Sequence, residues 1–181
     1  MNARAESTIL ALLALLAFSF PAWAERADRD KPIQIEADKL KVDDARKTSV
    51  YEGHVVLTQG TLMITAQRVD IRQDDQGMTS GEAQGKPAYF RQRMDAKPGA
   101  KADAAGEYVE GWAERIEYDG RGDKLKLVGQ ARLLRGEDEL RGNLITYDGV
   151  TGHYQAQGGV GGAPGRVRAV IRPKSNPADK P

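Results

Sequence analysis

Few residues in this 181-residue chain could carry chemistry on a substrate, and its acidic residues are the first to consider. Asp43 and Asp119 stand 76 positions apart, and two carboxylates could serve acid/base catalysis or bind calcium. Both lie where a turn is expected to start, and there an aspartate side chain accepts hydrogen bonds from nearby backbone amides. We therefore interpret both as turn residues and predict no catalytic residue.

Composition excludes several other kinds of site. The chain has no cysteine, which excludes disulfides, thiolate zinc sites and a cysteine nucleophile. Its two histidines, His54 and His153, are too few for a histidine-rich metal centre, and we predict neither a metal nor a cofactor. A net charge of +1 gives no long-range attraction to nucleic acid.

Residues 1–24 have the pattern of a cleavable signal peptide. Arg4 precedes the apolar run 9–20, and Ala22-Trp23-Ala24 has the small-x-small pattern of a cleavage site. The run is shorter than the roughly 20 residues that a membrane-spanning helix needs. We expect export, a flexible mature N-terminus over 25–31, and one domain in the remaining chain.

An internal repeat with a spacing of 76 residues is the main signal in that remaining chain. The segment 37–43 matches 113–119 by chemical type at almost every position. The register then continues without a gap, so that Gly53 coincides with Gly129. We infer two copies of one supersecondary unit, at about 33–90 and 109–171.

Within each copy apolar and polar residues alternate, as they do in strands with one apolar face. A two-residue hairpin loop at 59–60 predicts Leu57 opposite Leu62. In the second copy, the preceding turn predicts Tyr118 opposite Leu125. The mature chain shows no convincing helical period, so we predict an all-β, antiparallel fold.

Two segments break this alternation. Residues 92–107 are polar, contain Ala, Gly and Pro, and exceed a hairpin loop in length, so we expect a mobile insertion. Glycines dominate from Gly158 onward and are followed by prolines, although 166–171 could form a last edge strand. We place the domain at 32–172 and a disordered tail at 173–181.

Four elements together carry a family resemblance. They are IQIEADKL at 33–40, YEGHV at 51–55, QGTL at 59–62 and GKPAYFRQ at 85–92. In combination they resemble the LptA/OstA-like family of periplasmic lipopolysaccharide transport proteins, and the likeness runs from about Pro32 to Arg172. It departs from the family in the insertion and the tail.

The resemblance implies a twisted, incompletely closed antiparallel β-jelly roll, built from the two related repeats, with an apolar interior slot for the acyl chains of lipopolysaccharide. It implies a periplasmic location and no enzymatic activity. It also implies an LptC-like partner at the inner membrane and an LptD-like partner at the outer membrane. These domains would join end to end by strand addition, as would further copies of this chain.

The apolar pattern agrees with a slot, because large apolar side chains are too sparse for a compact sandwich of this length. The predicted lipid-binding lining is Ile33, Ile35, Leu40, Leu57, Leu62, Ile64, Phe90, Ile116, Tyr118 and Leu125. Ordinary core packing is the alternative for any one of them. Four basic residues could bind lipid phosphates at the opening, or belong to a solvated face: Arg68, Arg72, Lys86 and Arg91.

Both ends of the predicted sheet have exposed edges, which proteins usually protect. The edge residues expected to meet a neighbouring domain are Pro32, Ile33, Gln34 and Ile35 at one end and Val167, Val170 and Ile171 at the other. A head-to-tail contact of this sort produces open filaments instead of a closed dimer.

Two other functions stay open. One is a periplasmic glycan-binding module or hydrolase on a repeated β scaffold, with Asp43, Asp119 or Trp112 at its site. The other is a structural bridge without direct lipid contact.

Overall fold

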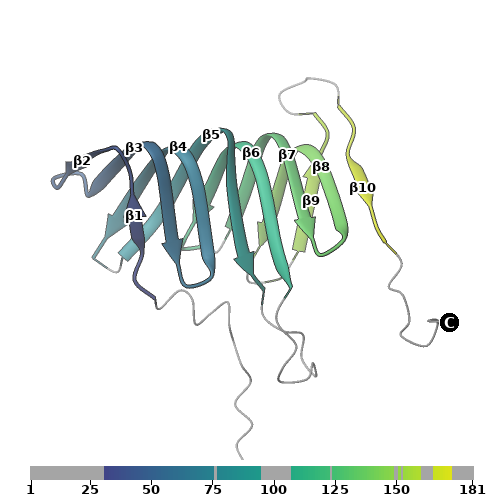
Figure 1. The fold of residues 1–181 in the computed structure, drawn as a ribbon, viewed down its shortest axis with the longest axis horizontal. Coiled ribbons are helices and arrows are strands. Elements are labelled where there is room, and N and C mark those ends of the chain that lie inside the picture. The colour runs from purple at the N-terminus through teal and green to yellow at the C-terminus, as the bar shows by residue number, and fades with distance from the viewer. Residues whose placement is uncertain are drawn as a thin grey trace, which may run out of the picture.

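The computed structural model describes residues 31–75, 77–94, 107–122, 124–148, 151, 153–159 and 165–172. Every regular element in these ranges is a strand, and ten strands form one antiparallel sheet (Figure 1). The strands are β1 (Gln34–Glu36), β2 (Lys39–Asp43), β3 (Thr48–Gln59), β4 (Leu62–Asp74), β5 (Gly77–Arg93), β6 (Tyr108–Asp119), β7 (Lys124–Arg135), β8 (Asp138–Asp148), β9 (His153–Gln157) and β10 (Arg168–Val170). The predicted all-β, antiparallel fold is confirmed.

Several predicted segments lie outside the described residues. They are the signal peptide at 1–24, most of the N-terminal segment 25–31, most of the insertion 92–107 and the tail 173–181. Within the described ranges, the search for a helix long and apolar enough to cross a membrane finds none.

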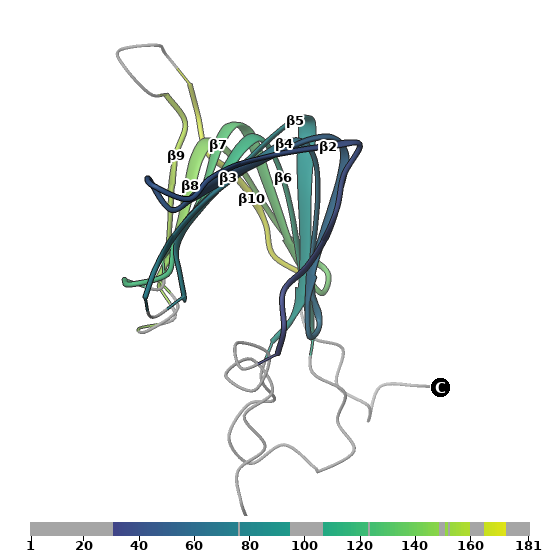
Figure 2. The ribbon, with the colours of Figure 1, turned by 90° about the vertical axis from the view of Figure 1, so that its left-hand side faces the viewer.

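The sheet is folded over along a line that crosses the middle of its long strands, so that two walls face each other (Figure 2). In each of the five successive pairs from β3–β4 to β7–β8, the pairing register shifts partway along the strands. Such bulges bend a strand and increase its twist. The first wall carries β2 and β9 at its edges and the second wall carries β1 and β10.

The bulges in β3 and β7 have the same backbone conformation. Gly53 and Gly129 have φ values of 81° and 79°, and the residues after them, His54 and Gln130, have 44° and 47°. A carboxylate sits beside each pair: Asp38 Oδ2 is 2.8 Å from His54 Nδ1, and Glu114 Oε1 accepts a 2.9 Å hydrogen bond from Gln130 Nε2. A Cβ on either glycine would collide with that carboxylate side chain, so both positions require glycine.

The hairpin between β3 and β4 differs from the prediction by two residues. Its loop is 60–61, which sets Leu57 opposite Ile64 instead of Leu62. Gly60, with φ of 59°, occupies the first loop position, where a type II′ turn favours glycine. A shift of two residues keeps every side chain on its predicted face. The pairing of Tyr118 with Leu125 is as predicted.

The start of the insertion was also wrongly placed. Gln92 and Arg93 belong to β5 and pair with Val109 and Tyr108 of β6. The backbone amide of Met94 then donates a 2.9 Å hydrogen bond to the carbonyl of Glu107. The side chains of these residues continue to alternate between the two faces of the strand. They were assigned to the insertion because they are as polar in sequence as the segment that follows.

The core lies between the two walls. Its buried residues come from the inner faces of β3 to β8 and are Val55, Leu57, Val69, Ile71, Ala83, Ala88, Phe90, Val109, Ala113, Ile116, Leu127, Ala131, Leu133 and Ile145. Burying these side chains holds the walls together, since each large one contributes about 1.5–3 kcal/mol.

Candidate functional site

An apolar cavity of about 100 Å³ opens between the two walls. It is lined by Leu57, Gln59, Leu62, Ile64, Val69, Ile71, Met78, Gly81, Glu82, Ala83, Phe90, Gln92, Ile116, Tyr118, Leu125 and Tyr147. These residues come from β3 to β8, so the cavity follows the inner surface across most of the sheet. Such a lining suits an apolar ligand that enters between the walls.

Seven of the ten residues predicted to bind lipid line this cavity: Leu57, Leu62, Ile64, Phe90, Ile116, Tyr118 and Leu125. Ile33 and Ile35 lie outside it and pack, partly buried, against the core. Leu40 also lies outside this cavity, on the edge strand β2 with 55% of its surface exposed, and its contact with lipid stays a prediction. Strand alternation gave its face correctly, but not its distance from the centre of the sheet.

Four large apolar residues of the lining were missing from the predicted set. Val69 and Ile71 stand in an alternating stretch of β4, and that pattern was sufficient to find them. Tyr147 could have been found through the repeat, because it lies 76 positions after Ile71. Met78 is the second residue of β5, and no sequence pattern marked it.

A glycine makes room for the aromatic ring of Phe90. Phe90 faces Gly111 across the β5–β6 pairing, and a Cβ at position 111 would overlap the Phe90 ring. Tyr118 faces Gly81 in the same strand pair. Tyr154 of β9 stacks on Tyr147 with ring centroids 4.5 Å apart, at the C-terminal end of the first wall.

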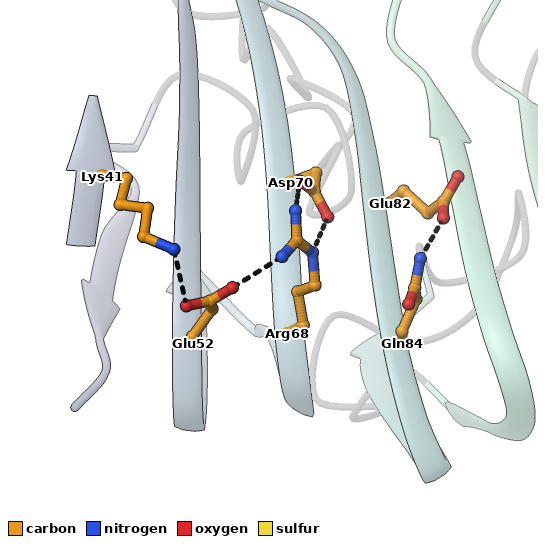
Figure 3. Close-up of polar contacts among 6 residues, drawn as sticks. All are labelled: Lys41, Glu52, Arg68, Asp70, Glu82 and Gln84. Carbon is orange, nitrogen blue, oxygen red and sulfur yellow. Dashed lines mark hydrogen bonds and ion pairs between the residues drawn. The ribbon is translucent and has the colours of Figure 1, made fainter. Parts of the chain in front are cut away.

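The structure corrects the prediction that Arg68 binds lipid phosphate at the opening. Since Val69 faces the core, Arg68 points to the outer face of the first wall. There its guanidinium donates 2.7 Å and 2.6 Å hydrogen bonds to Asp70 and one of 2.6 Å to Glu52 (Figure 3). The hydrogen bond to Asp70, together with both carboxylate charges, raises the pKa of Arg68 despite partial desolvation.

The other three predicted phosphate ligands are also absent from the cavity lining. Arg91 lies on the outer face, with its guanidinium carbon 3.8 Å from the centre of the Tyr108 ring. Arg72 alternates with the buried Ile71, and Lys86 lies at the bulge of β5. The cavity therefore offers a ligand apolar contact without a cationic side chain in its lining.

A family model described as LptA/(LptD N-terminal domain) LPS transport protein matches residues 34–153. The chain belongs to this family. It is 36% identical over 135 residues to the lipopolysaccharide export system protein LptA of Escherichia coli (strain K12). The aligned residues make up 74% of this chain and 68% of that protein. Identity to the Haemophilus influenzae protein of the same name is 30% over 170 residues, or 91% of each chain.

A solved structure supports the same assignment. The crystal structure of LptH, described as the LptA homologous periplasmic component of the lipopolysaccharide transport device from Pseudomonas aeruginosa, matches with a TM-score of 0.68 and 29% identity. The match covers 81% of this chain and 99% of that one. The folded-over sheet is thus the fold of this LptA-family member, and the predicted family is confirmed.

The residues considered for catalysis have structural roles in this LptA-family chain. Asp43 Oδ1 accepts a 3.0 Å hydrogen bond from the Arg46 amide. Asp119 Oδ1 accepts hydrogen bonds of 3.0 Å and 3.2 Å from the amides of Arg121 and Gly122. Both are turn residues, as predicted. Within the described ranges, no group of three His, Cys, Asp or Glu residues is placed to hold a metal ion.

Trp112 belongs to an aromatic cluster outside the slot. Its ring lies 5.1 Å from that of Tyr89, and the Arg132 guanidinium carbon lies 4.9 Å from its centre. The Tyr89 hydroxyl donates a 2.6 Å hydrogen bond to Glu110. Burial, helped by this carboxylate, raises the pKa of Tyr89 to about 12. The cluster covers the outer side of the second wall.

Proposed function

We propose that this protein carries lipopolysaccharide through the periplasm with the acyl chains held between its two walls. The observation that carries the proposal is the apolar cavity that extends across the inner faces of β3 to β8. Family membership supports the same function, since the named relatives are lipopolysaccharide export proteins. A cleaved leader at 1–24 would deliver the mature chain to the periplasm.

The cavity of about 100 Å³ is too small for a whole acyl chain, because an apolar cavity of about 150 Å³ holds only one benzene molecule. The walls must therefore part when the ligand enters. Within the described ranges, strands pair only with their neighbours in the sheet. The long strands run from one wall into the other through the bend. The separation of the walls can increase by bending without breaking a strand pair.

Apolar contact is strong enough to hold such a ligand. Each methylene moved out of water contributes about 0.8 kcal/mol, so a dozen contribute on the order of 10 kcal/mol before the costs of binding. Hydrophobic contact is not directional and has no preferred register along the slot. The ligand can therefore be held and still slide from one end of the sheet to the other.

We further propose that the sheet ends bind the partners. Within the described ranges, β1 and β2 pair only with β3, and β9 and β10 only with β8. Free backbone groups on these edges can accept a strand from an LptC-like or LptD-like domain, or from another copy of this chain. This arrangement would extend the slot across successive domains.

Photo-crosslinking tests lipid contact. A crosslinking side chain at Leu62 or Leu125, which line the cavity, is expected to capture lipopolysaccharide. The sequence neighbours Met63 and Lys126 provide matched controls, because alternate residues of a strand face opposite sides. Equal capture at lining and control positions would contradict the proposal. Capture of protein alone at all four positions would favour a bridge that does not touch lipid.

A further inference from the structure

A polar groove runs along the outer side of the bend that joins the two walls. Its larger part has a volume of about 880 Å³ and is lined by side chains of β4 to β7, among them Gln67, Gln84, Lys86, Trp112, Gln130 and Arg132. A smaller part of about 310 Å³ shares Gln67 and Lys86 with the first and continues to His54 of β3. We call the two parts together the bend groove.

The bend groove lies on the opposite face of the sheet from the apolar cavity. Ala83 and Ala113 are buried between the walls, so their sequence neighbours Gln84 and Trp112 point outward. Within the described ranges, the two linings share no residue. The outer side of the bend also faces away from the space between the walls (Figure 2). A ligand in the bend groove is therefore separated from the slot by the sheet itself.

Amide side chains are spaced along this groove. Gln67 of β4 and Gln130 of β7 stand at bulges, where neither has a partner in the strand pairing. Gln84 lies between them, at the start of the bulge in β5. In the second copy Asn143, 76 positions after Gln67, stands at the equivalent bulge of β8. An amide both donates and accepts hydrogen bonds, so this row suits a ligand with many hydroxyl or amide groups.

Some polar groups of the groove are available to a ligand. Gln67 and Lys86 are exposed, and neither side chain forms a hydrogen bond or ion pair within the part of the chain that the structure describes. In β5, residues 85–87 pair with neither β4 nor β6. Unpaired backbone groups and free side chains thus lie together at the middle of the groove.

Trp112 gives the groove a fixed aromatic surface. Its ring centroid lies 5.1 Å from that of Tyr89, and the Arg132 guanidinium carbon lies 4.9 Å from its centre. Glu139 in turn holds Arg132 through a 2.5 Å hydrogen bond. An indole offers apolar contact together with an N–H donor. A sugar ring, with its C–H face and its hydroxyl groups, requires this combination.

The lining disfavours other polymers. Arg115 and Arg132 are paired with Glu117 and Glu139, which leaves Lys86 as the one lysine or arginine of the described lining without a carboxylate partner. That is too little positive charge for a nucleic acid. Strands β3 to β7 have paired neighbours on both sides, so the groove offers a peptide no free strand edge.

We propose that the bend groove binds an extended, β-1,4-linked glycan that carries N-acetyl groups. Neighbouring strands lie about 4.8 Å apart, close to the length of one sugar unit in such a chain. Gln67, Gln84, Glu114 and Gln130 come from four successive strands and therefore meet successive sugars, whose acetamide groups pair with amide side chains. The five strands β3 to β7 span about 20 Å, enough for about four sugars. This binding goes beyond lipid carriage, because it attaches the protein to a polysaccharide and leaves the slot free.

Tryptophan fluorescence tests glycan binding. Once the expected leader 1–24 is removed, Trp112 is the only tryptophan of the chain. Tetra-N-acetylchitotetraose is expected to change its fluorescence saturably. Di-N-acetylchitobiose, which spans half of the groove, and maltotetraose, an α-1,4-linked glucose chain without N-acetyl groups, should each bind at least tenfold more weakly. No saturable change, or equal affinity for the two tetramers, would overturn the proposal.

Substitution of exposed glutamines locates the site. Gln67→Ala is expected to weaken binding of the chitotetraose about threefold to tenfold, because it removes a hydrogen-bonding group that has no partner in the described part of the protein. Gln73→Ala is the matched control, since it changes another exposed glutamine of β4 outside the groove, and it should leave the affinity within about twofold. The same affinity in both variants would reject the bend groove as the site.

Lipopolysaccharide separates this inference from the proposed function. Saturating lipopolysaccharide should leave the chitotetraose affinity within about twofold, and Gln67→Ala should not reduce lipid capture by a crosslinker at Leu125. Displacement of the chitotetraose by lipopolysaccharide would overturn the proposal of a separate glycan site, because the sugar bound in the groove would then be that of the cargo. Glycan binding without any lipid capture would reject lipid carriage and leave the glycan site standing.

Discussion

Phe90 lies directly across from Gly111 on the neighbouring strand β6, and its ring fills the space where a side chain at position 111 would begin. Phe90 is also part of the cavity lining and is 4% exposed. The shape of the slot at this point depends on one glycine on the adjacent strand.

Gly111→Ala is therefore expected to destabilise the protein by about 1–3 kcal/mol, because the added methyl group forces the Phe90 ring out of place. Urea unfolding followed by circular dichroism measures the change. Gly81→Ala is the matched control, since a Cβ there meets its nearest neighbour, Met78 Sδ, at 3.8 Å, an ordinary contact. Equal destabilisation by both substitutions would show that the Phe90 contact is not the cause.

Leu125→Gln is expected to weaken lipopolysaccharide binding at least tenfold. Its partly buried side chain lines the cavity, and its replacement removes about 1.5 kcal/mol of apolar contact with the ligand. Lys126→Gln changes the next residue, on the outer face, and should leave the affinity within twofold. Affinity measured by displacement of a fluorescent lipid from the purified protein distinguishes the two variants. A loss of the same size in both would move the binding site away from the slot.

Arg68→Gln should leave the same affinity within about twofold and lower stability by less than about 1 kcal/mol, because its partners Asp70 and Glu52 are partly exposed on the outer face. The experiment tests the corrected position of this residue. A large loss of affinity, abolished by added salt, would instead reinstate Arg68 as a phosphate ligand.

Alternation and repetition in the sequence were sufficient to predict the strands, their apolar faces and most of the lining. They were insufficient where the exposure of a residue depends on the place of its strand in the sheet. Leu40 has the pattern of a core residue, yet its strand has a neighbour on one side only. The basic residues were assigned to the opening by their chemistry, whereas strand parity relative to Val69 and Phe90 places Arg68 and Arg91 outside. Parity should therefore have taken precedence over residue type.

The pH dependence of stability should include a contribution from Glu139 at acidic pH. Hydrogen bonds from Arg141 and Arg132, 2.6 Å and 2.5 Å long, lower the pKa of Glu139 below its ordinary value of 4.5. A lowered carboxyl pKa stabilises the fold above the unfolded-state pKa, and this stabilisation is lost as pH falls through the folded-state pKa. Melting temperatures at neutral pH and near pH 3 should therefore converge between wild type and Glu139→Gln as pH falls. A constant difference would contradict the ion pairs.

At alkaline pH, Tyr89 is the group expected to contribute to the pH dependence of stability. Burial is the main reason that the pKa of this phenol rises to about 12 from 10.0, and the hydrogen bond to Glu110 adds to it, against a smaller opposing effect of Arg91. A raised pKa means that the neutral phenol stabilises the fold fully below pH 10, and this contribution declines as pH rises toward 12. Spectrophotometric titration of the tyrosines should show one late-ionising group that is missing in Tyr89→Phe and shifted to lower pH in Glu110→Gln. Tyr108→Phe, on the same outer face, should leave the late step unchanged. Loss of the late step in Tyr108→Phe would mean that the late-ionising phenol had been wrongly assigned to Tyr89. The packing of the outer face, where the rings of Tyr89 and Trp112 lie together, would then be wrong as well.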